Sequence, residues 1–131
     1  MEAGLYIPVA DDITVEADSG GHTDGRPLVS ILPALMALAN RVQKQYSYPK
    51  KVRVGAGGGI GTGLSCLGAF QLGAAYVVTG SVNQACVEAG TSDYVKKVLS
   101  ETAMADVTMA PCADMFESGT KVEVIKKGTM Y

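Results

Sequence analysis

The 131-residue chain is 47% hydrophobic and nearly neutral, with 11 basic and 13 acidic residues that give a formal net charge of −2. This composition fits at most one globular domain and excludes a disordered tail, and it offers no basic surface for nucleic acid. No apolar run reaches the roughly 18 to 20 residues that a membrane span needs, so we expect no membrane partner.

The first predicted unit is a strand followed by a loop and a helix. Residues 12–17 (DITVEA) are rich in strand formers and lead into the loop 18–22 (DSGGH). Apolar residues recur at three- and four-residue spacing over 27–46, which predicts a helix. Pro33 is tolerated if the helix begins near Leu28, because the proline then falls in its opening turns; otherwise it marks a kink.

The second unit repeats this order. Residues 51–56 read as a strand that runs into the glycine run 57–61, and the apolar segment 63–72 predicts a short helix closed by Gly73. The second unit therefore has the same order of elements as the first, namely a strand, a glycine-containing loop and a helix.

The third unit begins with a predicted strand at 75–79, which ends in the loop 80–83 (GSVN). A helix should cover residues 92–102, where Ser92 can cap the first turn. The remaining stretch 105–117 is apolar without a clear period, and 121–125 (KVEVI) alternates as a strand does. We therefore divide the chain into βα units at 1–103 and a mixed C-terminal extension at 104–131.

Three strand-loop-helix units predict an α/β fold with a parallel sheet. Three parallel strands leave two open edges, whereas a complete (β/α)8 barrel takes about 250 residues. We expect that the sheet is completed by a missing half of a barrel or by another chain, such as a second copy in a homo-oligomer.

The glycine loops are the first candidate site, because ligands of parallel α/β folds bind at the carboxyl ends of strands. Gly58, Gly59, Gly80 and Ser81 could offer backbone N–H groups to a phosphate. The alternative is that these glycines only make tight turns. A nicotinamide Rossmann site is disfavoured, because no acidic residue ends a following strand to bind a ribose hydroxyl.

His22 is the only histidine, and it follows a predicted strand end. Asp18 and Asp24 lie close in sequence and could raise its pKa, which suits a proton donor or acceptor near neutral pH. The alternative is an ordinary loop histidine. One histidine with scattered aspartates lacks a recognisable ligand spacing, so we predict no metal site.

Three cysteines, Cys66, Cys86 and Cys112, form an odd set without CxxC spacing, and the N-terminus lacks the features of a signal peptide. We therefore expect reduced thiols in a cytoplasmic protein, with the cysteines packed as small apolar side chains. The methionines of the extension are expected in packing, although they could also form an adaptable wall for an acyl chain.

Several of these strings resemble one family. Residues 16–22 (EADSGGH) resemble the glycine-glycine-histidine motif of the flavin-dependent 2-nitropropane dioxygenase family, which includes nitronate monooxygenases and flavin-type enoyl-acyl carrier protein reductases. Residues 56–60 and 78–81 resemble its two FMN-phosphate motifs. The strings 10–24, 78–93 and 104–117 are similar to a subgroup, the trans-acting (PfaD-type) enoyl reductases of polyketide and polyunsaturated fatty acid synthases.

The resemblance implies the C-terminal portion of a TIM (β/α)8 barrel that carries FMN and takes hydride from NADPH or NADH. The substrate would be an enoyl thioester on an acyl carrier protein, and His22 would donate a proton or orient the thioester carbonyl. The cofactor contacts implied are the backbone amides of Gly58, Gly59, Gly80 and Ser81 on the phosphate, with Thr79 beside them and Gly21 near the flavin ring. Ser81 stands where the wider family often has threonine.

Two other functions stay open from the sequence. A nitronate monooxygenase would use the same flavin and histidine but pass electrons to dioxygen. A non-catalytic scaffold or docking component of a synthase complex would bind no flavin and pair its strand edges with another chain. Because the earlier barrel strands are absent, we expect this segment alone to be inactive as an enzyme.

Overall fold

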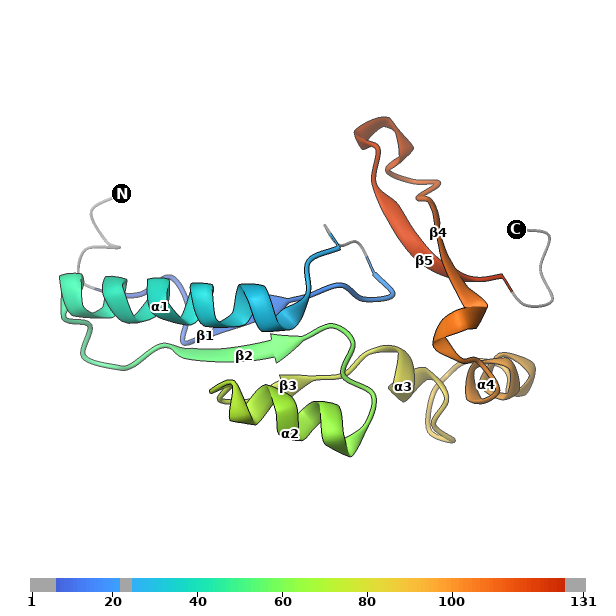
Figure 1. Ribbon diagram of the computed structural model, residues 1–131, viewed down its shortest axis with the longest axis horizontal. Helices are drawn as coiled ribbons and strands as arrows, with labels where there is room; N and C mark the ends of the chain where they lie inside the picture. The colour runs from blue at the N-terminus through green and yellow to red at the C-terminus, as the bar shows by residue number, and fades with distance from the viewer. Residues whose placement is uncertain (1–6, 22–24, 127–131) are drawn as a thin grey trace.

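The computed structural model describes residues 7–21 and 25–126. Its first part is a three-stranded parallel sheet in the order β1-β2-β3 (Figure 1). The elements in this part are β1 (Asp12–Glu16), α1 (Leu28–Tyr46), β2 (Arg53–Gly57), α2 (Gly63–Gln71) and β3 (Val77–Val78). The three predicted parallel strands are therefore present, and they lie side by side in chain order.

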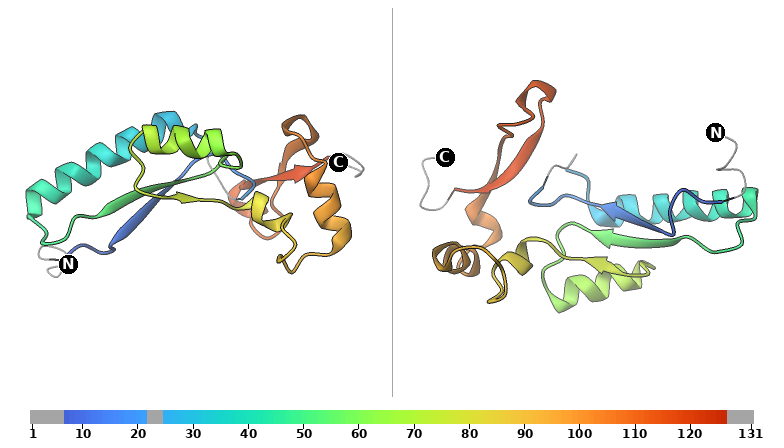
Figure 2. Two further views of the ribbon diagram at one scale, coloured as in Figure 1. Left: turned by 90° about the horizontal axis from the view of Figure 1, so that it is seen from below. Right: turned by 180° about the vertical axis from the view of Figure 1, so that it is seen from behind.

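Both helices cover the same face of this sheet, which leaves the other face open (Figure 2). Successive strand residues point to opposite faces, so only alternate residues contact the helices. Val15 of β1 and Leu32 of α1 are almost completely buried, and Ala56 of β2 lies with them. The core of the protein is thus the layer between α1, α2 and the sheet.

The helix α1 begins at Leu28, as Pro33 requires, and runs without interruption to Tyr46. Pro33 lies in its second turn, where the helix loses one backbone hydrogen bond but continues. Ser47 ends the helix in a left-handed conformation with φ 50°. The Gln43 side chain accepts a hydrogen bond from the Val52 amide at 3.3 Å, which ties the end of α1 to the approach to β2.

The helix α2 has well-defined ends. Thr62 and Ser65 form a capping box at its start, in which each side chain hydrogen-bonds to the other residue's backbone amide. Gly73 follows the end of the helix at φ +100°, a conformation that L side chains rarely adopt, and Met36 packs against it. The sequence prediction of glycine closing this helix is confirmed.

The third unit differs from the sequence prediction in its lengths. β3 has only two residues, because pairing with β2 is limited to Val77 and Val78 within the predicted strand 75–79. A short helix, α3 (Ser81–Gln84), occupies the predicted loop. The helix α4 (Asp93–Ser100) lies inside the predicted range, and the Ser92 side chain accepts a hydrogen bond from the Val95 amide at 3.3 Å as expected of a cap.

The C-terminal extension forms an antiparallel hairpin of β4 (Val107–Pro111) and β5 (Lys121–Ile125). The alternation in the sequence predicts β5, whereas β4 lies in the stretch that shows no clear period. Two short 3-10 turns, η2 (Met104–Asp106) and η3 (Phe116–Ser118), flank β4 on either side. Figure 1 shows α4 and the hairpin beyond the carboxyl ends of β1 and β2, at the end of the sheet that carries the glycine loops.

None of the helices in the part of the chain that the structure describes is long and apolar enough to cross a membrane.

Candidate functional site

The glycine loop after β2 is shaped by two left-handed residues. Gly58 has φ +90° and Gly59 has φ +68°, conformations that favour glycine strongly. A Cβ atom at Gly58 would lie 2.5 Å from the carbonyl oxygen of Ala17, which belongs to the loop after β1. The Ala17 amide also donates to the Gly57 carbonyl at 2.9 Å, so the first and second loops are packed backbone to backbone.

The loop after β3 meets the loop after β1. A Cβ atom at Gly20 would lie 3.1 Å from the Ser81 hydroxyl oxygen, which is closer than most side-chain contacts. Gly80 is the N-cap residue of α3, and its carbonyl oxygen accepts a hydrogen bond from the backbone N–H of Asn83 at 2.9 Å. Although β1 and β3 are not neighbours in the sheet, their loops touch above the end of β2.

The amides of the predicted phosphate residues are available for a ligand. Within the described part of the chain, the N–H groups of Gly58, Gly59, Gly80 and Ser81 donate no hydrogen bond to a protein acceptor. Gly58 is half-buried, and the other three are exposed. Free backbone donors grouped on glycine loops at the carboxyl edge of a parallel sheet can bind an anion, and they would need a ligand or water as partner.

The other predicted site residues are placed differently. Thr79 lies beside Gly80 as expected, but its hydroxyl donates a hydrogen bond to the Asn83 side-chain oxygen at 3.1 Å. The side-chain NH2 group of Asn83 in turn donates to the Thr79 carbonyl oxygen at 2.9 Å. Thr79 thus holds the start of α3. Sequence reasoning misses Asn83, although its position four residues after Thr79 is the spacing of a helix-start contact. Gly21 is exposed next to Glu16, and His22 lies outside the described residues.

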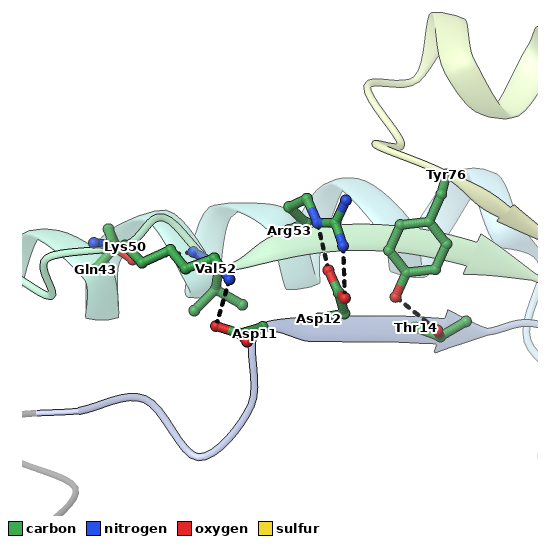
Figure 3. Close-up of polar contacts among 8 residues, drawn as sticks. All are labelled: Asp11, Asp12, Thr14, Gln43, Lys50, Val52, Arg53 and Tyr76. Carbon is green, nitrogen blue, oxygen red and sulfur yellow. Dashed lines mark hydrogen bonds and ion pairs between the residues drawn. The ribbon is translucent and has the colours of Figure 1, made fainter.

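Four charged side chains, those of Asp11, Asp12, Lys50 and Arg53, lie together at the opposite end of the sheet (Figure 3). Arg53 donates two hydrogen bonds to Asp12, at 2.6 and 2.8 Å, and Lys50 forms an ion pair with Asp11 at 3.1 Å. The hydrogen bond from the Arg53 guanidinium, with its positive charge, lowers the pKa of the Asp12 carboxyl. These pairs tie the starts of β1 and β2 together, far along the strands from the glycine loops.

Metal-ligand clusters and reactive thiols do not mark a second site. No group of three or more His, Cys, Asp or Glu side chains that could hold a metal ion occurs among residues 7–21 and 25–126. Cys86 is exposed, which is contrary to the expectation of packed cysteines, while Cys112 is buried and donates to the Asp114 carboxylate at 2.6 Å. That hydrogen bond, followed by burial, raises the pKa of the Cys112 thiol, which disfavours a nucleophilic thiolate.

Known proteins resemble nearly the whole chain. A polyunsaturated fatty acid synthase component of Thraustochytrium sp. is 55% identical over 99% of the chain, and the polyketide biosynthesis protein PksE of Bacillus subtilis is 55% identical over 95%. A nitronate monooxygenase of Neurospora crassa is 36% identical over 76% of the chain. The chain spans only 9%, 16% and 25% of these three proteins, respectively. No protein-family model matches the chain.

Solved structures agree with the sequence relatives. The enoyl reductase domain of MlnA, from the macrolactin biosynthesis cluster of Bacillus amyloliquefaciens, matches 95% of this chain with a TM-score of 0.89 and 46% identity. FabK from Thermotoga maritima matches 90% with a TM-score of 0.66 and 25% identity. The chain covers 28% and 33% of these two structures, which are TIM-barrel enoyl reductases. In sequence and in fold, the chain therefore matches the C-terminal part of a nitronate monooxygenase-like enoyl reductase.

Proposed function

We propose that this chain provides the FMN-phosphate loops and the active-site histidine of an enoyl reductase that acts on acyl carrier protein-bound enoyl thioesters in polyketide or polyunsaturated fatty acid synthesis. The observation that carries this proposal is the convergence of three glycine loops at one edge of a parallel sheet, with four backbone amides left for a ligand. The similarity to a fatty acid synthase component and to an enoyl reductase domain supports the substrate class.

The loops fit the phosphate of FMN. Gly58 has no room for a Cβ atom because the Ala17 backbone lies there, which brings the first and second loops together, and Gly59 and Gly80 present bare backbone beside it. Phosphate binding by backbone amides needs no basic side chain, which agrees with the position of Arg53 and Lys50 at the far end of the sheet. The amide of Ser81 at the start of α3 would add a fourth donor, so serine in place of threonine leaves this contact intact.

FMN would supply hydride transfer from NADPH or NADH to the β-carbon of the enoyl thioester. The glycine loops of this chain would hold the phosphate. Gly21, which has no side chain, would leave room for the flavin ring beside it. His22 would then donate a proton to the substrate or hydrogen-bond to the thioester carbonyl so that negative charge on it is stabilised. The strand-end position of His22 in the sequence is the usual place of catalytic groups in TIM barrels.

The face of the sheet opposite the helices has its own consequence for assembly. In a TIM barrel the helices lie outside and this face points to the packed interior, yet Thr14 and Val78 on it are exposed in this chain. We infer that further barrel strands cover this face, from the same polypeptide or from another component of a synthase complex. The acyl carrier protein would then approach from the carboxyl edge, where the glycine loops lie.

The substitution His22→Ala tests the proposed catalytic role in the full-length protein. We expect FMN to remain bound and turnover of an enoyl thioester to fall by roughly 10² to 10⁴, the usual effect of losing a general acid or base. The visible flavin spectrum and the flavin content of the purified variant are the controls for binding. Unchanged turnover would remove His22 from the mechanism.

A nitronate monooxygenase is the second candidate, supported by the Neurospora relative. The two reactions are separated by assaying the same flavin-loaded protein with an enoyl thioester plus NAD(P)H and with an alkyl nitronate plus dioxygen. We expect turnover of the thioester only. A protein that retains no flavin in either assay would instead support a scaffold or docking role.

A further inference from the structure

The open face of the sheet has a gap over β2 that a tyrosine fills. In the register of the sheet, Arg53, Gly55 and Gly57 of β2 lie on this face, so beyond Arg53 at its start β2 contributes no side chain there. Tyr76 directly precedes β3, and its ring lies over β2 (Figure 3). The ring is so close to Gly55 that a Cβ atom at Gly55 would overlap it. Glycine inside a strand often marks such a close approach.

The same tyrosine reaches the far strand. Its hydroxyl lies 2.9 Å from the Thr14 hydroxyl, and the two form a hydrogen bond in which either oxygen can be the donor. Thr14 belongs to β1, which does not pair with β3. Tyr76 therefore bridges all three strands, from β3 across the bare backbone of β2 to β1.

β3 needs such a bridge more than the other strands do. Its ladder with β2 covers only two residue pairs, and the adjoining bonds are Ala56 N–H to Tyr76 O at 3.0 Å and Ala75 N–H to Val54 O at 2.8 Å. By contrast, β1 pairs with β2 along five residues. The loop with Gly80 and Ser81 begins directly after this short strand. Any displacement of β3 would therefore displace the backbone amides of these two residues.

We propose that Tyr76 is a positioning residue that holds the third glycine loop against the first two. The hydrogen bond to Thr14 sets the distance between β1 and β3 below the loops, and the contact of Gly20 with Ser81 sets it above. Between these two points lie the amides assigned to the phosphate. The effect on cofactor binding rests on the proposed function, whereas the effect on loop order does not.

Two variants remove the hydrogen bond from opposite sides. Tyr76→Phe keeps the ring over Gly55 and deletes only the hydroxyl, and Thr14→Val replaces the partner by a side chain of similar shape. Tyr94→Phe on α4 is the matched control, because this tyrosine is 75% exposed and lies away from the sheet. All variants are made in the full-length protein.

Two readouts separate positioning from general stability. Hydrogen exchange measured by mass spectrometry reports the order of residues 77–84 relative to residues 12–20 and 53–60. The dissociation constants of FMN and riboflavin, measured by flavin fluorescence, report the phosphate contacts alone, because these two ligands differ only in the phosphate. A merely structural role would weaken both ligands together and leave their ratio unchanged.

We expect Tyr76→Phe and Thr14→Val each to speed exchange in 77–84 and to lower the preference for FMN over riboflavin about fivefold, the effect of one neutral hydrogen bond. The double variant should lose no more than either single variant, since both delete the same bond. Tyr94→Phe should change neither readout.

Unchanged exchange in 77–84, or losses that add in the double variant, would overturn the positioning role. Faster exchange with an unchanged FMN preference would also overturn it, because the loop would then not need the bridge to bind phosphate. If the unmodified protein does not prefer FMN to riboflavin, the proposed function fails instead, and the exchange result alone decides whether Tyr76 orders the loop.

Discussion

The glycines of the second loop give a graded test of the site geometry, and Gly58→Ala is the central change. Gly58 combines φ +90° with a backbone oxygen, that of Ala17, at 2.5 Å from the position of a Cβ atom. A side chain held in such a conformation costs of order 1–3 kcal/mol, and overpacking against a group that cannot rotate away adds about 1–3 kcal/mol. We expect Gly58→Ala to lower the free energy of unfolding by about 3 kcal/mol.

Two neighbouring glycines provide the matched comparison. Gly59 has φ +68° but ample space, with the nearest oxygen at 3.8 Å, so Gly59→Ala should cost only the conformational strain of about 1–2 kcal/mol. Gly61 has neither a positive φ nor a neighbour within 4 Å, so Gly61→Ala should be neutral or stabilising by up to about 1 kcal/mol.

The measurement is urea unfolding of the three alanine variants, followed by FMN titration of those that fold. The expected order of destabilisation is Gly58, then Gly59, then Gly61. A bulkier change, Gly59→Leu, should weaken FMN retention although it leaves the core untouched, because the side chain would cover the exposed amides. Equal stability losses at Gly58 and Gly61 would refute the geometric reasoning, and normal flavin content in Gly59→Leu would refute the phosphate assignment.

Two further predictions concern titratable groups. The raised pKa and burial of Cys112 should make iodoacetamide label it far more slowly than Cys86 near neutral pH, and Asp114→Asn should speed its labelling; equal rates for the two thiols would contradict this. Because the pKa of Asp12 is lowered in the folded protein, its pairing with Arg53 stabilises fully above the ordinary carboxyl range and is lost as the pH falls through the lowered value. Asp12→Asn should therefore make unfolding less dependent on pH in the acid range, which urea titrations at several pH values measure, and an unchanged acid dependence would exclude this pair as a cause.

The helices and the long strands are predictable because their signals are local. The apolar spacing of residues 27–46 fixes α1 within one residue, and Pro33 correctly places its start. The start of α4 is also predicted within one residue, because Ser92 supplies the cap that its residue type suggests, whereas the helix ends at Ser100, two residues before the predicted end. In α1 the hydrophobic period and the proline position agree, and in α4 the hydrophobic period and the capping serine agree, so tertiary contacts only reinforce what the local sequence favours.

The parts that escape prediction depend on contacts between distant residues. β3 shrinks to two residues because a strand exists only where a neighbour pairs with it, and the hydrophobic run alone does not reveal where pairing stops. β4 is paired to β5 across a long connection, and its methionine and Pro111 hide the alternation. α3 begins within the predicted loop because Asn83 hydrogen-bonds to Thr79, a side-chain contact that composition does not indicate.

For the candidate site, the residue types are readable from the sequence but their arrangement is not. Clustered glycines indicate a close backbone approach, yet only the fold shows that Gly58 packs on Ala17 and that Gly20 meets Ser81. Gly55 carries the same signal, since an isolated glycine within a strand suggests a close neighbour, but inside the predicted strand 51–56 it passes for an ordinary strand residue. The neighbour, Tyr76, precedes another strand and cannot be named without the sheet register.

The glycines of β2 and its loop therefore serve two different purposes. At Gly55 the missing side chain makes room for a tyrosine of the same protein, which links β3 to β1. At Gly58, three residues further on, the missing side chain lets two loops touch and leaves amides for a ligand. If the loops only made tight turns, the position of the short strand β3 would not need to be fixed by the hydrogen bond between Tyr76 and Thr14. A site for a small anionic group needs its hydrogen-bond donors to stay in place when the ligand is absent. The Tyr76 bridge between the strands and the free backbone amides of the loops at the strand ends together meet this need.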